Sequence, residues 1–296
     1  MRPEVSPILL PEAFVSAPRL LILLTNDDGI RSPGLLAAAR AVCDLADLLI
    51  VAPAVQQSGM GRGTPPIVGG SVTQQHLAEL LGPQVDCHNV SAYSLTGSPA
   101  QAVIYGILAL APRRPDLVIS GINYGENLGT CVTASGTVGA ALQAAEFGIP
   151  AMAVSLETIA AYHYHHGDDV DWRIAAHTTR AFANAMLRTR LPFDVDVLKI
   201  DVPADARPDT PWRITRQSRQ PYFWLFRAAN QPPPNPGELV RLDYEIRINW
   251  ETLEPDSDIH AFVRDRVIAV TPLSHDLTSR VGRKELETVL QGVNLP

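Results

Sequence analysis

The sequence predicts an α/β protein in which helices flank a mostly parallel sheet. Two observations support this: short apolar runs alternate with helical stretches through the first half of the chain, and polar segments containing glycine follow several of these runs. A strand buried on both faces of a parallel sheet is continuously apolar, and strands separated by helices are typical of such sheets. With 296 residues, of which 46% are apolar and 19% charged, the chain can bury a sizeable core.

The predicted elements follow one another in a regular order. Proline suits the first turn of a helix and glycine its end, which explains helix starts at Pro33 and Pro99 and a helix end at Gly148. Strands are expected at residues 20–24, 48–52, 116–120, 151–155, 195–202 and 267–271. Helices are expected at residues 33–46, 99–111, 135–147, 170–191 and from 278 onward.

The second half of the chain differs from the first, because strand-like segments there are separated by proline-rich breaks. The stretch 232–237 must be a loop. We predict an N-terminal tail at residues 1–18, an α/β core at 19–160, and a C-terminal part at 161–296 with a sheet extension, a β-hairpin arm and a terminal helix. The tail lacks the pattern of a secretory signal, and no run of about 18 apolar residues predicts a membrane span.

The net charge and the cysteine content argue against several classes of function. The net charge of −7, from 31 acidic and 24 basic residues, argues against sequence-independent binding to nucleic acid polymers. The cysteines, Cys43, Cys87 and Cys131, are odd in number and widely spaced, so we expect neither a disulfide framework nor a zinc site. This cysteine usage favours a reducing, cytoplasmic location.

The first chemical motif is the segment 25–30, Thr-Asn-Asp-Asp-Gly-Ile, at the carboxyl end of the first strand. Open α/β sheets bind ligands at this edge. The adjacent carboxylates of Asp27 and Asp28 would be costly beside a buried strand unless a cation neutralised them, and oxygen ligands suit Mg²⁺ or Mn²⁺. The alternative is a polar turn in which Gly29 supplies the bend.

The second motif, residues 57–63, follows the second strand and contains three alternating glycines. A dinucleotide-binding loop needs a helix directly after its glycines, and the two prolines at 65–66 forbid one, which disfavours a redox enzyme of that type. We expect a loop that brings Ser58 and Arg62 over the site. The alternative is a plain surface loop.

Two more motifs lie farther along the chain. Residues 120–129 follow the third strand, so Asn123 is expected to face the same crevice as Asp27. The Ser-Gly-Thr segment 135–137 begins a helix, whose free N–H groups would suit a phosphate group. The alternative for this segment is an ordinary helix N-cap.

Together these motifs resemble the survival protein SurE family, over nearly the whole chain from residue 20 to the terminal helix. The matching segments are Thr25-Asn26-Asp27-Asp28-Gly29, Ala52-Pro53, Gln57-Ser58-Gly59, Gly97-Ser98-Pro99, Ser120-Gly121-Ile122-Asn123, Asn127-Leu128-Gly129, Ser135-Gly136-Thr137-Val138, Thr215-Arg216-Gln217, Val270-Thr271-Pro272-Leu273 and Asp276-Leu277-Thr278. The resemblance implies a Rossmann-like catalytic core and a C-terminal arm exchanged between the subunits of a homodimer or homotetramer.

The activity that the resemblance implies is a metal-dependent phosphatase acting on nucleoside 5′- and 3′-monophosphates. One divalent ion per subunit, Mg²⁺ or Mn²⁺, would be held by the residues that match the family's ligands, Asp27, Asp28, Ser58 and Asn123. The phosphate group would be bound by Asn127, Ser135, Gly136 and Thr137, with Arg62 and Arg216 as weaker candidates. Asp28 or a hydroxide on the metal would activate water, and His275 would donate a proton to the leaving oxygen.

Several positions depart from the family pattern. The family usually has an aspartate, and a tyrosine three residues later, where this chain has Cys131 and Ala134, and that aspartate has an acid–base role. A thiol of ordinary pKa is a poor substitute for it. The departure motivates an alternative function: a nucleotide- or phosphate-binding oligomer that keeps the metal site with impaired catalysis. Gln101 replaces a common aspartate, and the family's histidine falls on Ser274, one position before His275.

Two remaining clusters have a structural and a functional interpretation. The histidines of residues 163–166, with Asp168 and Asp169, could bind a metal such as zinc, but we favour an exposed loop. The basic and aromatic residues of 212–224 could stack on bases. In an acidic protein we favour a hairpin packed at a subunit interface.

Overall fold

The computed structural model describes residues 19–293, apart from 66–69, 77–86, 88, 164–166, 168, 228–234, 239 and 241. The predicted tail 1–18, Pro66, the first half of the proline-rich loop (232–234) and three members of the histidine–aspartate cluster (His165, His166 and Asp168) lie outside the described residues. Among the residues that are described, no helix is long and apolar enough to cross a membrane.

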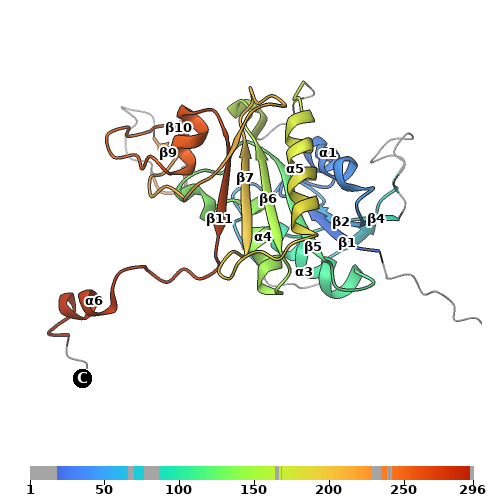
Figure 1. The fold of residues 1–296 in the computed structure, drawn as a ribbon, viewed down its shortest axis with the longest axis horizontal. Coiled ribbons are helices and arrows are strands. Elements are labelled where there is room, and N and C mark those ends of the chain that lie inside the picture. The colour runs from blue at the N-terminus through green and yellow to red at the C-terminus, as the bar shows by residue number, and fades with distance from the viewer. Residues whose placement is uncertain are drawn as a thin grey trace, which may run out of the picture.

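A nine-stranded sheet runs through the described part of the chain in the order β3-β4-β2-β1-β5-β6-β7-β11-β8 (Figure 1). Its strands are β1 (Leu21–Thr25), β2 (Asp47–Pro53), β3 (Val72–Gln74), β4 (Val90–Leu95), β5 (Leu117–Tyr124), β6 (Ala151–Leu156), β7 (Val197–Val202), β8 (Trp212–Ile214) and β11 (Ile268–Leu273). The strands from β4 to β7 are parallel, whereas β3 pairs antiparallel with β4 and β11 with β7. The predicted α/β class with a mostly parallel, Rossmann-like sheet is confirmed.

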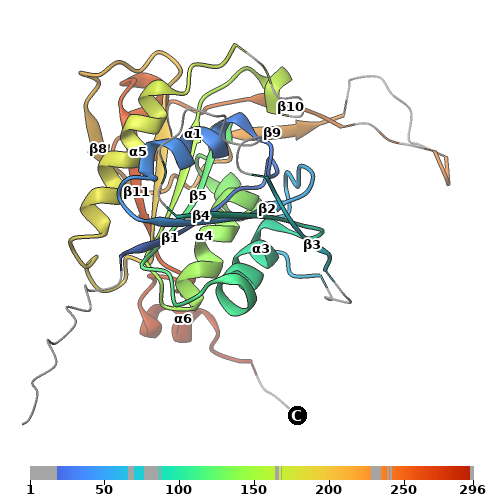
Figure 2. The same cartoon turned by 90° about the vertical axis from the view of Figure 1, so that its right-hand side faces the viewer.

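Helices cover both faces of the sheet, as Figure 2 shows. Helices α1 (Pro33–Val42) and α5 (Arg173–Met186) pack on one face, and α3 (Pro99–Tyr105) and α4 (Gly136–Glu146) pack on the other. Side chains alternate along β1, so Ile22 and Leu24 enter the core beneath α1 while Leu21 and Leu23 enter the core beneath α3 and α4. Burial on both faces explains why this strand is apolar throughout.

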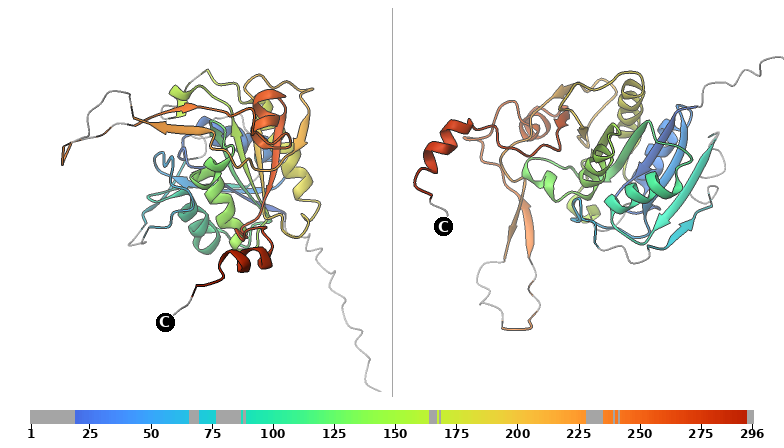
Figure 3. Two further views of the ribbon diagram at one scale, coloured as in Figure 1. Left: turned by 90° about the vertical axis from the view of Figure 1, so that its left-hand side faces the viewer. Right: turned by 90° about the horizontal axis from the view of Figure 1, so that it is seen from below.

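The C-terminal part extends the sheet and then leaves it. Strands β9 (Phe223–Phe226) and β10 (Asp243–Ile246) pair antiparallel as a hairpin that projects from the body (Figure 3). Helix α6 (Arg283–Val289) lies apart from the body and buries none of its residues. A third core cluster, which includes Leu128 and Phe262, joins the loop after β5 to the C-terminal part.

Most predicted elements are present, with shifted ends. The helix expected at 99–111 ends as an α-helix at Tyr105 and continues as a π-helical turn at Gly106–Leu110, and the terminal helix begins at Arg283 instead of 278. Short 3₁₀ turns occupy Thr130–Thr133 and Ala160–His163, and a π-helical turn occupies His260–Arg264. The division into three segments stays a prediction.

The expectation of no disulfide is wrong. Cys43, at the end of α1, is bonded to Cys87, which precedes β4. Spacing along the chain gave no sign of this pair because 44 residues separate the two cysteines, and the folding of β2 and β4 side by side brings them together. Cys131 is free.

Candidate active site

The two adjacent aspartates lie at the carboxyl edge of the sheet, directly after β1. A reciprocal turn holds them there: the side chain of Asn26 donates to the carbonyl of Gly29 and accepts from its N–H, both at 3.1 Å. Gly29 has a φ of +100°, a backbone conformation that residues other than glycine rarely adopt. The turn leaves Asp27 only 5% and Asp28 only 3% exposed. The polar turn is therefore present, and it is what buries the carboxylates, while metal binding by them stays a prediction.

Each carboxylate has a defined set of donors. The Thr137 hydroxyl donates to Asp27, while the backbone N–H of Tyr124 and the amide of Gln56 donate to Asp28 at 3.1 and 3.2 Å. At Gly136 a Cβ atom would lie 2.7 Å from an oxygen of Asp27, so glycine there lets the start of α4 approach the carboxylate.

Burial gives this pair its electrostatic character. Burial raises the pKa of Asp27, and burial together with the neighbouring charge of Asp27 raises the pKa of Asp28 well above its ordinary value. Two buried carboxylates that resist ionisation are stabilised by a cation close to both.

Asn123 and Ser58 complete an oxygen-rich corner. The register of β5 against β6 shifts between Ser120 and Asn123, and such irregularities redirect side chains. The amide nitrogen of Asn123 donates to the carbonyls of Tyr124 and Gly125 at 3.1 and 2.7 Å, so of its two amide atoms only the oxygen is suited to a cation. Carboxylate, amide and hydroxyl oxygens are the donors that Mg²⁺ and Mn²⁺ take. The donor set fits a hard divalent ion.

A cavity of about 320 Å³ joins this corner to the start of α4. Asp27, Ser58, Asn123, Asn127 and Ser135 line it together. The Ser135 hydroxyl accepts from the N–H of Val138 at 3.1 Å, so Ser135 is an N-cap as well as part of the cavity wall. The amide of Asn127 donates to Ser155 at 2.9 Å, and Thr137 is committed to Asp27.

The structure does not bring Arg62 or His275 to this cavity. Arg62 donates to Gln143 at 3.0 Å and pairs with Glu146, both on α4. The imidazole of His275 pairs with Asp196 at 3.0 Å. Since β11 is antiparallel to β7, the end of β11 that carries His275 lies beside the start of β7, at the sheet edge opposite Asp27.

Glu126 is a titratable residue of the cavity wall that the motif analysis did not single out. It is 4% exposed, and one of its carboxylate oxygens has no hydrogen-bond partner among the described residues. Burial raises its pKa to about 7, although the Tyr222 hydroxyl donates to it. A single acidic residue in a glycine-rich segment gives no sign of such burial, because Tyr222 comes from a distant part of the chain.

Part of the cavity wall is aromatic. Phe223, Leu225 and Tyr244 line it from the hairpin, and His163 lines it from the turn before α5. Tyr244 pairs with Leu225 across the hairpin, and the period of two along β9 puts Phe223 and Leu225 on one face. The ring of His163 lies 3.1 Å from the Tyr244 hydroxyl, and burial lowers its pKa, so the imidazole is neutral.

The two departures from the family pattern also line the cavity. The Cys131 sulfur accepts from the N–H of Phe223 on the hairpin at 3.5 Å, and Ala134 directly precedes Ser135. Among the described residues, no group of three or more histidine, cysteine or acidic side chains is placed to hold a metal.

Comparisons with known proteins agree with this geometry. Residues 22–223 match the family model described as Survival protein SurE. This chain belongs to the SurE family. The resemblance predicted from the sequence is therefore confirmed.

Named relatives and a solved structure extend the match. A protein of Thermococcus gammatolerans named 5'-nucleotidase SurE is 38% identical over 282 residues, covering 93% of this chain and 97% of that protein. One of the same name from Methanothermobacter thermautotrophicus is 45% identical over 236 residues, covering 77% of this chain and 86% of that protein. The crystal structure of the SurE protein from Aquifex aeolicus superposes with a TM-score of 0.69 at 26% identity, covering 91% of this chain and 99% of that one.

Proposed function

We propose that this protein is a divalent-metal-dependent phosphatase that hydrolyses nucleoside 5′- and 3′-monophosphates to nucleoside and phosphate. The observation that carries the proposal is the cavity that Asp27 lines beside the N-terminus of α4, with the carboxylate of Asp28 buried next to it in the sequence. Relatives named 5'-nucleotidase over most of this chain support it, and none of the comparisons favours the impaired binding protein.

Asp27, Asp28, Ser58 and Asn123 would hold the cation, Mg²⁺ or Mn²⁺, one per subunit. When bound, this ion neutralises charge on the phosphoryl oxygens and orients water for in-line attack. The Thr137 hydroxyl fixes the orientation of Asp27, and the N–H of Tyr124 fixes that of Asp28. The cavity therefore presents its carboxylates in set positions.

The start of α4 and Asn127 would bind the phosphate group. Free N–H groups at a helix N-terminus attract an anion and stabilise charge that develops during phosphoryl transfer. The second amide hydrogen of Asn127 remains for a phosphate oxygen, since the first is directed to Ser155. Arg62 and His275 lie outside this arrangement, so we assign them no step.

The aromatic end of the cavity supports a nucleoside as the leaving group. Aromatic side chains bind bases by stacking, with little dependence on base identity. The rings of Phe223 and Tyr244 line the same cavity as Asn127 and Ser135, so a nucleoside whose phosphate group is bound there would meet them.

Exposed apolar residues in the C-terminal part support self-association. Apolar residues of the hairpin and of α6 are exposed in a single chain, and Leu225, Ile246 and Val289 are each more than half exposed. Such surfaces are typical of interfaces, and we propose a homodimer or homotetramer joined by these arms. The cytoplasmic location stays a prediction, because the Cys43–Cys87 disulfide removes the argument from cysteine usage.

The test is phosphate release from a panel of 5′- and 3′-mononucleotides with Mg²⁺, Mn²⁺ or EDTA, with the Asp27→Ala variant measured beside the wild type. We expect release that requires metal and disappears in the variant. No release with any metal, in a protein that still binds metal and nucleotide by calorimetry, would contradict the phosphatase and favour a binding protein.

A further inference from the structure

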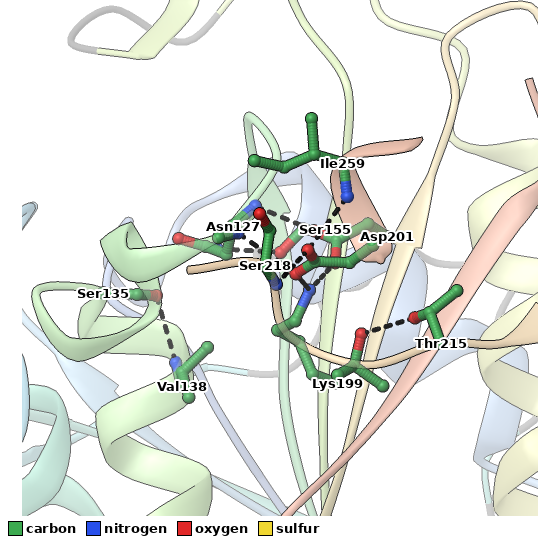
Figure 4. A network of polar contacts seen from close by, with 12 residues as sticks. Asn127, Ser135, Val138, Ser155, Lys199, Asp201, Thr215, Ser218 and Ile259 are labelled. Atoms are coloured by element: carbon green, nitrogen blue, oxygen red, sulfur yellow. Dashed lines mark hydrogen bonds and ion pairs between the residues drawn. The ribbon is translucent and has the colours of Figure 1, made fainter. Parts of the chain in front are cut away.

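A buried ionic cluster lies next to the loop after β5, which carries Asn127 (Figure 4). Lys199 is in the middle of β7 and is completely buried, as are Asp201 on the same strand and Asp258 in the segment before the π-helical turn 260–264. The period of two along a strand puts Lys199 and Asp201 on one face. The ammonium group of Lys199 pairs with Asp201 and lies 3.2 Å from Asp258.

Charges without access to water are costly unless each is paired and hydrogen-bonded. Burial opposes the charged form of Lys199, but the two carboxylates outweigh it and raise the pKa of Lys199 above its ordinary value. Asp258 also accepts from the backbone N–H groups of Ser218 and Ile259, both at 2.9 Å. The cluster is thus a satisfied network, and such networks fix one arrangement of the groups that they bind.

Two of the groups held by this network belong to the loop after β5. Asp201 accepts from the backbone N–H of Asn127 at 2.7 Å, and Asp258 accepts from that of Gly129 at 3.1 Å. Gly129 has a φ of +57° and packs so closely that a Cβ atom would lie 2.3 Å from the carbonyl of Gln220. The loop therefore has one well-defined backbone position, set by carboxylates on β7 and in the C-terminal part.

We propose that Lys199 is a positioning residue for phosphate binding: by pairing with Asp201 and Asp258 it holds the backbone of residues 127–129 where Asn127 faces the cavity. The inference rests on the proposed function for the role of Asn127. It adds a residue that touches neither substrate nor metal, and it links the catalytic edge of the sheet to the C-terminal part of the chain.

The first test compares Lys199→Met with Thr215→Val. The substitution at 199 leaves both carboxylates without a cation. Thr215 is a matched control, because its hydroxyl makes a buried hydrogen bond of 2.8 Å to Thr271 and no contact to the loop. We expect Lys199→Met to raise the KM for AMP and the inhibition constant of inorganic phosphate about tenfold, with a smaller change in kcat. Thr215→Val should change both constants less than twofold.

A second pair of variants covers the case in which Lys199→Met does not fold. Lys199→Met/Asp201→Asn and Lys199→Met/Asp201→Leu both remove the charges of Lys199 and Asp201 and differ little in side-chain volume. Only the asparagine keeps an oxygen that accepts from the N–H of Asn127. We expect the asparagine double variant to stay within about threefold of the wild-type KM and the leucine double variant to show the tenfold rise.

Hydrogen exchange of the Asn127 and Gly129 amides, measured in the metal-free protein, gives a readout that does not depend on turnover. We expect faster exchange at both in Lys199→Met, and at Asn127 in the leucine double variant, with Thr215→Val like the wild type. Folded variants that keep wild-type exchange and phosphate inhibition would overturn the proposal. A wild type that neither hydrolyses AMP nor binds phosphate would instead overturn the proposed function, while the exchange data would still decide the role of Lys199.

Discussion

The two ends of the cavity are built in different ways. The polar end consists of residues that follow β1 and β2, that end or follow β5, or that cap α4, and its aspartate, Asp27, is almost completely buried. The aromatic end comes from a two-stranded hairpin that projects from the body, where Leu225 is 71% exposed. One end is part of the core of the fold, and the other is an attachment to it.

This difference suggests that the polar end determines catalysis and the hairpin determines which substrates bind. Burial makes the charged forms of Asp27 and Asp28 costly, and a cation beside them would offset that cost. Substitutions there should affect every substrate alike. The hairpin can change its side chains without disturbing the core, so substitutions there should affect only substrates that carry a base.

The largest effect is expected at Asp27. In Asp27→Asn a ligand charge is lost while the shape is kept, so kcat/KM should fall at least about a hundredfold for AMP and for ribose 5-phosphate alike. Because burial raises the pKa of Asp27, its ionised form is costly in the folded state. The variant should therefore be more stable than the wild type at pH 8 in EDTA, as measured by urea unfolding.

The matched control is Asp209→Asn, since Asp209 is an exposed carboxylate that does not line the cavity. It should change neither activity nor stability. If Asp27→Asn retained wild-type turnover, or lost stability in EDTA, the polar end would not be the cation site.

The next effect concerns the aromatic end. Tyr244→Ala should raise the KM for AMP about tenfold, because one base–aromatic contact is worth about 1–3 kcal/mol. The KM for ribose 5-phosphate, which lacks a base, should stay within twofold. Trp224→Ala is the control: Trp224 lies between Phe223 and Leu225 on β9, and its side chain therefore points to the other face of the hairpin. Equal losses for both substrates would show that the hairpin acts on the chemistry and not on the base alone.

Glu126 lies in the cavity wall, and its titration should make the stability of the protein depend on pH. Burial raises its pKa from 4.5 to about 7 in the folded protein, so the folded state binds a proton that the unfolded chain releases at lower pH. The free energy of unfolding should therefore fall as the pH rises from 4.5 through 7. Glu126→Gln lacks this loss and should be more stable than the wild type by up to about 3 kcal/mol at pH 8.

Urea unfolding of wild type and Glu126→Gln at pH 4.5 and pH 8 measures this difference. At pH 4.5 the two proteins should differ little, because Glu126 is then protonated in the folded wild type and about half protonated in its unfolded chain. A constant difference at both pH values would indicate a packing effect and would exclude a titration of Glu126.

The sequence predicted the polar end far better than the aromatic end, for a physical reason. The carboxyl ends of parallel strands meet at one edge, so Asp27 and Asn123 could be placed together from strand order alone. The rings of Phe223 and Tyr244 face the cavity only because the hairpin folds back past the loop after β5, and no local pattern encodes that path. The same holds for Cys43 and Cys87, and for Lys199, whose partner Asp258 is distant in sequence.

The smallest effect on catalysis is expected at the disulfide. Cys43 ends α1 and Cys87 precedes β4, so the bond lies at the sheet edge opposite the cavity. Cys43→Ser should leave kcat/KM for AMP within twofold. It should lower the free energy of unfolding by about 2–4 kcal/mol, because the unfolded chain is no longer constrained by a closed loop. Reduction of the wild type should reproduce both results, whereas a loss of activity at full folding would show that this distant edge is coupled to the site.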